Sequence, residues 1–245
     1  MGHKHLRARS STSSPQGVTS TRSSLVFVPS GYDANVTHRL VFGFHGAGGS
    51  GASFRSQAGT DLERQAAGDA VFIYPNALMN GNRTAWLEAN LAKDRQAFDA
   101  LYQKALDSYC IDPSKVYAVG FSSGAGMSED VGCRRADLVR GIAGSEGWGA
   151  AQPPCVRPVA AILYDSNPGP GYAAWDPWGK SSEEERRVLN GCSTTTRPAP
   201  GSGCSAFDGC TAPFTNCVQN PPSGTEHKWP TWFGKAAWDF LLAAP

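Results

Sequence analysis

Apolar residues along the chain gather in short, nearly continuous runs separated by longer polar or amphipathic stretches. The runs that we expect to form strands lie at residues 25–28, 40–44, 70–74, 116–119 and 159–163. Runs in which polar and apolar positions do not alternate are typical of strands that are buried on both faces, as in a parallel sheet.

Helical spacing fills several of the stretches between these runs. One apolar face follows the i, i+3, i+4, i+7, i+8 pattern and is formed by Phe98, Leu101, Tyr102, Ala105 and Leu106. The same spacing predicts a C-terminal helix over residues 233–241, and helices are also expected over 183–189 and from residue 123 to near 133. Alternating strands and helices predict an α/β fold, with a mostly parallel sheet covered by helices on both faces.

Length and charge set the class of the protein. A chain of 245 residues with 40% hydrophobic content can bury one sizeable core, so we expect a single domain over residues 24–245. Residues 1–23 lack the apolar segment of a signal peptide and are expected to be a disordered polar tail. The net charge of +1 gives no reason to expect nucleic acid or a membrane surface as partner, and no apolar run could span a bilayer. We expect a monomer.

Cysteine usage indicates an oxidising compartment. Four of the seven cysteines lie between Cys192 and Cys217, in a stretch rich in glycine, proline, serine and threonine that has little apolar surface to hold it. Disulfides would stabilise this Cys-rich region, and the spacings do not fit paired zinc ligands. We therefore expect disulfides, no metal, a secreted protein and at least one unpaired thiol. Sequons at Asn35 and Asn82 would permit glycosylation.

Ser122 is the candidate nucleophile. It lies in Gly120-Phe121-Ser122-Ser123-Gly124, which fits G-x-S-x-G and stands between a predicted strand and a predicted helix. That setting is the nucleophile elbow of the α/β-hydrolase fold, where a sharp turn exposes the serine hydroxyl above the sheet. Without this context the motif would be a plain glycine-rich turn.

Elimination leaves His227 as the base. His3 and His5 lie in the polar tail, His38 precedes a strand, and His45 lies upstream of the serine in a glycine-rich turn. Only His227 follows Ser122, and the α/β-hydrolase order is serine, then acid, then histidine.

The turn at His45-Gly46-Ala47-Gly48-Gly49 is the candidate oxyanion loop. Acyl transfer builds negative charge on a carbonyl oxygen, which two backbone N–H groups can stabilise. We expect these donors to be the N–H of Ser123 and that of Ala47, with Gly48 as the alternative to Ala47.

These segments together resemble the extracellular esterase family that groups feruloyl esterases, acetylxylan esterases and short polyhydroxybutyrate depolymerases. The resemblance runs from about Ser24 to Phe240. It rests on the segments 39–46 (RLVFGFHG), 74–77 (YPNA), 109–112 (YCID), the serine elbow, 190–192 (NGC) and 227–230 (HKWP), together with Trp86, Asp94, Phe98 and Met127. It implies the α/β-hydrolase fold, ester hydrolysis, and catalysis by Ser122 and His227 without a cofactor.

The acid departs from the pattern of that family, in which the corresponding strand usually ends in His-Gly-Thr-x-Asp. Here the sequence is Leu163-Tyr164-Asp165-Ser166-Asn167. Asp165 directly follows the strand and is our preferred acid, while Asp176 is the alternative if its loop folds back.

Aromatic residues in predicted loops suggest a site for a phenolic or sugar group. We expect Trp86 and Trp229 to contact substrate; Trp148, Tyr172, Trp175 and Trp178 lie in similar loops. The leading substrate is a feruloyl ester of plant cell-wall polysaccharide, with acetylated xylan and polyhydroxybutyrate as alternatives. A non-catalytic polymer-binding protein of the same fold is the hypothesis from another class, because the expected acid is displaced.

Overall fold

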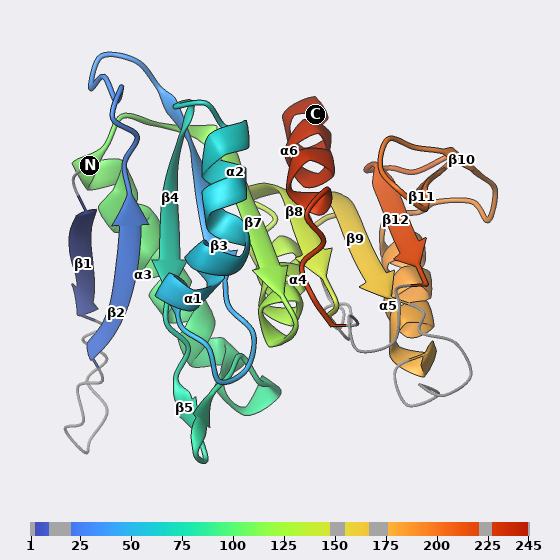
Figure 1. Ribbon diagram of the computed structural model, residues 1–245, viewed down its shortest axis with the longest axis horizontal. Helices are drawn as coiled ribbons and strands as arrows, with labels where there is room; N and C mark the ends of the chain where they lie inside the picture. Colours follow the sequence, from blue (N-terminus) through green and yellow to red (C-terminus); the bar gives the residue numbers. More distant parts are fainter. Residues whose placement is uncertain (1–2, 10–20, 148–154, 167–175, 221–226, 245) are drawn as a thin grey trace.

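A ten-stranded sheet runs through the described part of the computed structural model of the chain (Figure 1). The structure describes residues 3–9, 21–147, 155–166, 176–220 and 227–244. The spatial order of the strands is β1-β2-β4-β3-β7-β8-β9-β12-β11-β10. Their bounds are β1 His3–Arg9, β2 Thr21–Phe27, β3 His38–Phe44, β4 Ala70–Pro75, β7 Ile111–Phe121, β8 Val139–Ser145, β9 Ala160–Ser166, β10 Thr196–Pro198, β11 Cys204–Phe207 and β12 Phe214–Gln219.

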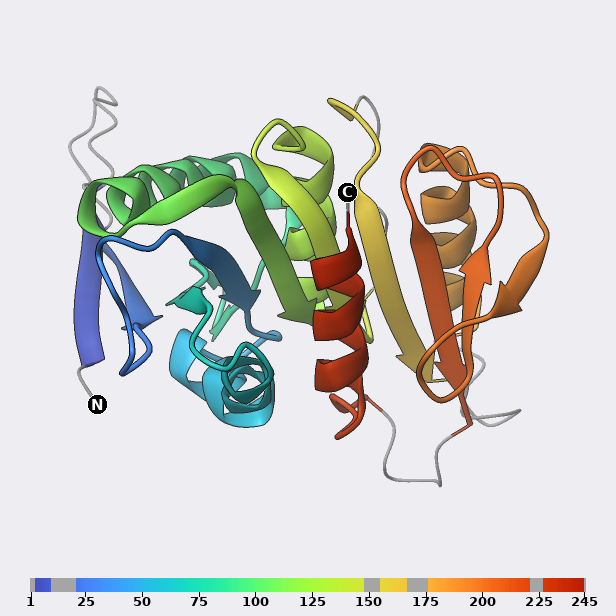
Figure 2. The ribbon, with the colours of Figure 1, turned by 90° about the horizontal axis from the view of Figure 1, so that it is seen from above.

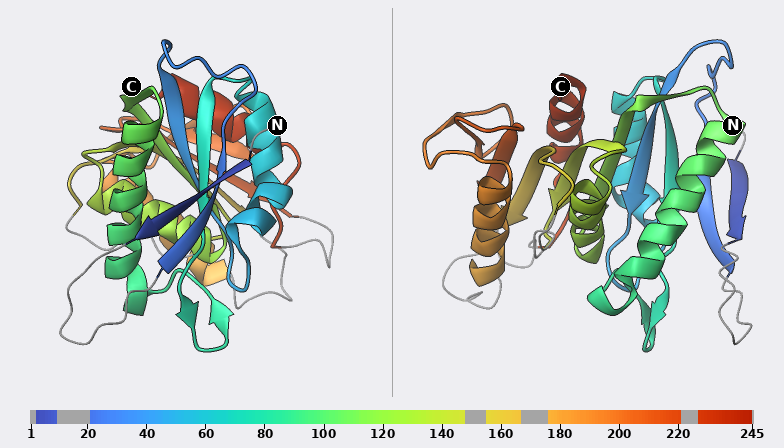
Figure 3. Two further views of the ribbon diagram at one scale, coloured as in Figure 1. Left: turned by 90° about the vertical axis from the view of Figure 1, so that its left-hand side faces the viewer. Right: turned by 180° about the vertical axis from the view of Figure 1, so that it is seen from behind.

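The six central strands, from β4 to β12 in the spatial order, pair in parallel, and the flanking strands pair antiparallel. Helices cover both faces of this sheet. Helix α1 (Gly51–Phe54), the π-helical turn Arg55–Gly59, α2 (Thr60–Gln65) and α6 (Phe233–Ala243) lie on one face. Helices α3 (Leu91–Ser108), α4 (Ser123–Arg134) and α5 (Asp176–Leu189) lie on the other (Figure 2; Figure 3, right). The prediction of an α/β-hydrolase fold is confirmed.

Side chains of each central strand divide between two cores, as the two-residue period of a strand requires. On β3, Leu40 and Phe42 pack with the core beneath α3 and α4, while Val41 packs with the core beneath α2 and α6. On β9, Leu163 belongs to the α4 side and Tyr164 to the α6 side. A side chain near the end of a central strand therefore lies on one face or the other according to its place in this alternation.

Part of the segment expected to be a disordered tail is a strand. Residues His3–Arg9 form β1, which pairs antiparallel with β2 in the register His3↔Phe27 to Arg9↔Thr21. An edge strand is held by backbone hydrogen bonds on one side, so its sequence needs no apolar run, and the pattern of polar residues gave no signal for it. The folded region therefore also begins before residue 24.

Three disulfides join the cysteines in the pairs Cys133–Cys155, Cys192–Cys210 and Cys204–Cys217, and Cys110 is free. The prediction of disulfides in the Cys-rich region and of one unpaired thiol is confirmed. Two of the bridges hold the β10–β11–β12 end of the sheet, where Cys204 and Cys217 face each other across adjacent strands.

A short hairpin outside the main sheet, formed by β5 (Met79–Asn80) and β6 (Arg83–Thr84), lies beside the end of β3, and a 3₁₀ turn at Glu88–Asn90 precedes α3. No helix among the described residues has both the length and the apolar character to cross a bilayer.

Candidate active site

Ser122 stands in a tight turn between the end of β7 and the start of α4. Its backbone has φ 55° and ψ −125°, an unusual conformation for a residue with a side chain. A Cβ on Gly120 would lie 2.0 Å from the carbonyl oxygen of Gly124, and one on Gly124 would lie 2.1 Å from that of Phe44. Both glycines of the motif are therefore required by close backbone contacts, which fits a nucleophile elbow.

The His227 ring meets the serine hydroxyl. Its Nε2 lies 3.0 Å from Ser122 Oγ, although the two residues are 105 positions apart in the sequence. The ring packs on Phe121, with 4.9 Å between ring centroids, and its side chain is 35% exposed. Burial lowers the pKa of His227, which favours the neutral imidazole. A neutral ring with its proton on Nδ1 leaves Nε2 to accept the proton of Ser122.

Glu146 is the carboxylate that the described structure brings next to His227. It directly follows β8, its side chain is 7% exposed, and its Oε2 lies 3.9 Å from His227 Nδ1. Its carboxylate also accepts hydrogen bonds from Ser166, at 3.1 Å from the backbone N–H and 3.0 Å from the hydroxyl. Burial raises the pKa of Glu146 to about 7, against the effect of the Ser166 hydrogen bonds.

Asp165, the expected acid, lies on the other face of the sheet. Its side chain lines a pocket on the α4–α5 side with Glu129 and Ser182, and no ion pair within 4.0 Å joins it to His227 among the described residues. The neighbouring Tyr164 faces α6, where it contacts Phe233, so strand alternation turns Asp165 away from the histidine. The preference for Asp165 as the orienting acid is thus corrected.

The alternative acid, Asp176, begins α5, and its side chain lies outside the described part of the chain. The sequence pattern does not single out Glu146, because the strand before it carries no recognisable signal. Residues 139–145 (VRGIAGS) contain two glycines, an alanine and an arginine, and so lack an apolar run. The usable signal was topological: a strand is required after α4, and its end would lie beside the elbow.

Backbone contacts hold the candidate oxyanion loop in place. The N–H of Gly48 donates to the carbonyl of Thr84 at 2.7 Å, and the Thr84 hydroxyl donates to the carbonyl of Gly49 at 2.7 Å. The Gly48 N–H is therefore already used. No such bond is recorded for the N–H of Ala47 or of Ser123 within the described residues, so these two groups fit the oxyanion role better.

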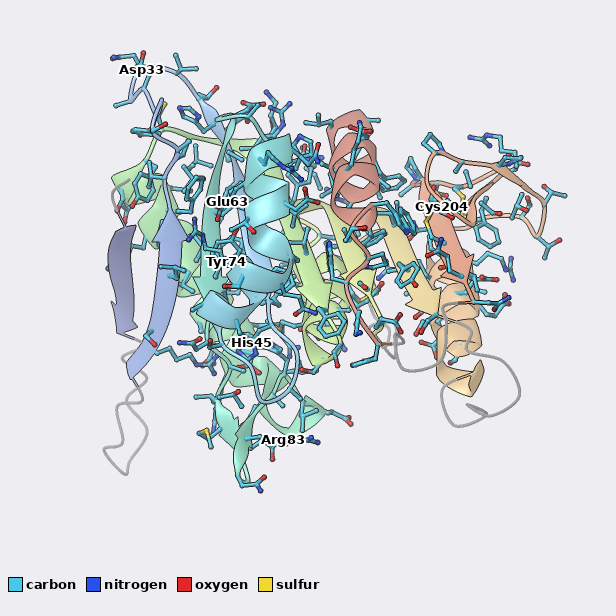
Figure 4. All side chains as sticks on the ribbon, in the orientation of Figure 1. Asp33, His45, Glu63, Tyr74, Arg83 and Cys204 are labelled. Carbon is cyan, nitrogen blue, oxygen red and sulfur yellow. A yellow bond between two sulfur atoms is a disulfide. The ribbon has the colours of Figure 1, made fainter. Side chains whose placement is uncertain are left out.

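His45 holds this loop in place through contacts of both of its ring nitrogens. Its Nδ1 lies 2.7 Å from the carbonyl oxygen of Gly46, and its Nε2 accepts a hydrogen bond from the N–H of Ala77 at 3.0 Å. These two contacts fix the tautomer with a proton on Nδ1, and burial lowers the pKa of His45. Figure 4 shows His45 between α1 and the β5–β6 hairpin that carries Arg83.

The two tryptophans expected to contact substrate are buried. Trp86 is 5% exposed and donates its indole N–H to the carbonyl of His45 at 2.9 Å, so it supports the oxyanion loop. Trp229 is 8% exposed and packs on Phe54 and Phe233. Little of either ring is exposed, and contact of these two residues with substrate stays a prediction. Of the other aromatic residues, Trp148, Tyr172 and Trp175 and the side chain of Trp178 lie outside the described residues.

A serine hydroxyl on a histidine, beside two free backbone donors, can perform nucleophilic acyl transfer. The described residues hold no group of three or more metal-ligating side chains. The chemistry that the serine, the histidine and the two backbone donors support is attack by Ser122 on a carbonyl carbon.

Comparison with known proteins points to ester hydrolysis. No family model matches the chain. It is similar to feruloyl esterase C of Emericella nidulans, with 30% identity over 239 residues that cover 89% of this chain and 82% of the relative. It is also 31% identical over 234 residues to a probable feruloyl esterase C of Aspergillus niger, again with 89% and 82% coverage.

Two solved structures share the fold. An acetyl xylan esterase from Aspergillus awamori superposes with a TM-score of 0.69 at 14% identity, covering 97% of this chain and 99% of that one. A ferulic acid esterase from Anaeromyces mucronatus gives a TM-score of 0.63 at 14% identity, covering 99% and 90%. With the sequence relatives, these findings show that the chain is a carboxylic ester hydrolase and belongs to the feruloyl esterase C family.

Proposed function

We propose that this protein is a secreted serine esterase that hydrolyses feruloyl esters of plant cell-wall polysaccharide. The observation that carries the mechanism is the 3.0 Å contact between His227 Nε2 and Ser122 Oγ at a nucleophile elbow. The substrate class is supported by the names of the sequence relatives, which are feruloyl esterases. Three disulfides in a chain of this size favour an oxidising, extracellular setting.

Acylation begins when His227 accepts the hydroxyl proton of Ser122 and the serine oxygen attacks the ester carbonyl carbon. The resulting tetrahedral oxyanion accepts hydrogen bonds from the N–H groups of Ser123 and Ala47. Protonated His227 then donates its proton to the alcohol oxygen of the polysaccharide, the C–O bond breaks, and the acid remains esterified to Ser122.

Deacylation repeats these steps with water. His227 removes a proton from the water molecule, hydroxide adds to the acyl carbon, and the same two N–H groups stabilise the second tetrahedral intermediate. Its collapse releases the carboxylic acid and returns the proton to Ser122. The elbow and the oxyanion loop are held by short backbone contacts, which keeps these donors in place in both halves of the reaction.

The test is a substrate panel assayed with the wild type, Ser122→Ala and His227→Ala. Methyl ferulate, acetylated xylan and a hydroxybutyrate oligomer represent the leading substrate and its two alternatives. We expect methyl ferulate to be hydrolysed with the highest kcat/KM, and each variant to lose at least about a thousandfold in kcat. Preference for acetylated xylan or the oligomer would replace the feruloyl assignment.

A fluorophosphonate probe tests the nucleophile separately from the substrate. The probe should label the wild type and not Ser122→Ala. Rates that are equal in the wild type and in Ser122→Ala would reject the serine mechanism. Absence of hydrolysis of every ester by a folded wild type would instead favour a non-catalytic polymer-binding protein.

A further inference from the structure

The imidazole of His227 needs a partner at Nδ1, because the ring becomes positively charged when it takes the proton of Ser122. Among the described residues, Glu146 is the acidic side chain within 4.0 Å of the ring, at 3.9 Å from Oε2 to Nδ1. This is longer than a hydrogen bond, but contacts of this kind commonly tighten only when substrate is bound.

Backbone strain marks the same three residues. Four non-glycine residues in the described chain have positive φ, and three of them are Ser122 at 55°, Glu146 at 55° and His227 at 52°. A side chain in this region costs free energy, and such residues concentrate at functional sites because the surrounding structure holds them there. Glu146 is the residue directly after β8, and its positive φ ends the extended backbone of that strand next to the elbow.

The carboxylate of Glu146 is held in place by the neighbouring strand β9. Both of its oxygens accept hydrogen bonds from Ser166 at the end of β9, and its own N–H donates to the carbonyl of Tyr164 at 2.8 Å. The adjacent Ser145 carbonyl accepts the N–H of Ser122 at 2.9 Å. The turn after β8 is thus tied directly to the nucleophile on one side and to β9 on the other.

From these contacts we propose that Glu146 is the positioning residue that orients His227 and stabilises its protonated form. The orienting acid of this esterase is then a glutamate at the end of the strand after the nucleophile helix, and not Asp165 at the end of the next strand. The proposal rests on the proposed function, since Glu146 acts only through His227.

In the described part of the chain, the titratable groups around Glu146 are His227 from the segment before α6, and Tyr164 and Asp165 from β9. Burial, with smaller effects of the nearby carboxylates, raises the pKa of Tyr164 to about 12 and that of Asp165 to about 7. The carboxylate of Glu146 favours the protonated form of His227, so its removal should lower the pKa of that histidine. The acidic limb of the kcat–pH profile should therefore move to lower pH.

The experiment compares Glu146→Gln, Glu146→Asp and Asp165→Asn with the wild type. Glutamine keeps the size of the side chain and one acceptor for Ser166 but removes the charge. Asp165→Asn is the matched control, because it removes the neighbouring, partly buried carboxylate of β9 that does not lie within ion-pair distance of His227. Each variant is checked for folding by thermal unfolding, and kcat and KM for methyl ferulate or p-nitrophenyl acetate are measured from pH 4 to 9.

We expect Glu146→Gln to lower kcat by at least about a hundredfold with little change in KM, and to move the acidic limb to lower pH. Glu146→Asp should regain part of the loss, and Asp165→Asn should stay within about threefold of the wild type. If Glu146→Gln does not fold, Glu146→Asp against Asp165→Asn decides the question.

The proposal is overturned if a folded Glu146→Gln, or failing that Glu146→Asp, keeps the wild-type kcat and pH profile. It is also overturned if Asp165→Asn shows the larger loss. In either case an active wild type that is inactivated by Ser122→Ala leaves the proposed function standing. An inactive wild type would instead count against the proposed function itself.

Discussion

Replacing Gly124 by alanine would place a methyl carbon 2.1 Å from the carbonyl oxygen of Phe44 and 2.6 Å from that of His45. Both neighbours are backbone atoms at the end of β3, so no side-chain rotation can relieve the clash. Helix α4 would have to move away from the oxyanion loop by about 1.4 Å to reach ordinary contact distance. That movement would separate the N–H of Ser123 from that of Ala47.

Overpacking of this kind costs about 1–3 kcal/mol, and we expect the upper end because backbone opposes the new methyl group. For a domain of this size, about 3 kcal/mol lowers Tm by roughly 6–12 °C. Because an oxyanion donor would also be displaced, kcat should fall by about a hundredfold or more at temperatures where the variant is folded.

Thermal unfolding and ester hydrolysis are measured for Gly124→Ala beside Gly31→Ala. Gly31 is the matched control, since a Cβ there would meet nothing within 4 Å. We expect the control to keep the wild-type Tm and kcat. A Gly124→Ala variant with both values unchanged would refute the argument that backbone contact between α4 and β3 builds the site.

The other predictions concern the anchors of the site and of the Cys-rich region. The pKa of His45 is lowered in the folded protein, so its contribution to stability is complete above its unfolded value near 6.5 and is lost as pH falls below it. The urea midpoint of the wild type should therefore fall more between pH 7.5 and 5 than that of His45→Gln, and equal changes would contradict this assignment. Replacing Cys204 and Cys217 together by serine should cost about 3 kcal/mol, because their disulfide closes a short loop, with kcat retained; an unchanged Tm would show that the bridge contributes nothing.

The central strands and helices could be predicted because their apolar positions match the positions that are buried in the structure. The run at 40–44 and the run at 116–119 are buried on both faces in β3 and β7, and the spacing around Phe98 matches the buried face of α3. The elbow motif could be placed for the same reason, since a clear strand precedes it. Here local pattern and tertiary structure agree.

Strand β8 could not be predicted, and with it Glu146 was missed. A Cβ on Gly141 would lie 2.9 Å from the Leu241 side chain of α6, and one on Gly144 would lie 3.0 Å from that of Leu163. Glycine is needed at both positions because neighbouring elements approach closely, and it removes the apolar run that identifies a buried strand. The displaced acid follows from this, because chain position alone favoured the strand that could be recognised.

The small strands of the C-terminal edge were also beyond the sequence pattern. Strands β10 and β11 are three and four residues long, and apart from Cys204, Ala206 and Phe207 they carry no apolar run. Disulfides replace the apolar burial that would otherwise mark such strands. The cysteines predicted the bridges, but not the strands that the bridges hold.

We propose that ester hydrolysis proceeds through a covalent acyl intermediate on Ser122. Rapid acid quench of the enzyme with a p-nitrophenyl ferulate solution, followed by peptide mass spectrometry, tests this directly. We expect a feruloyl adduct on the peptide that contains Ser122, and no adduct in Ser122→Ala. Turnover without an adduct, or an adduct on another residue with undiminished activity of Ser122→Ala, would contradict it.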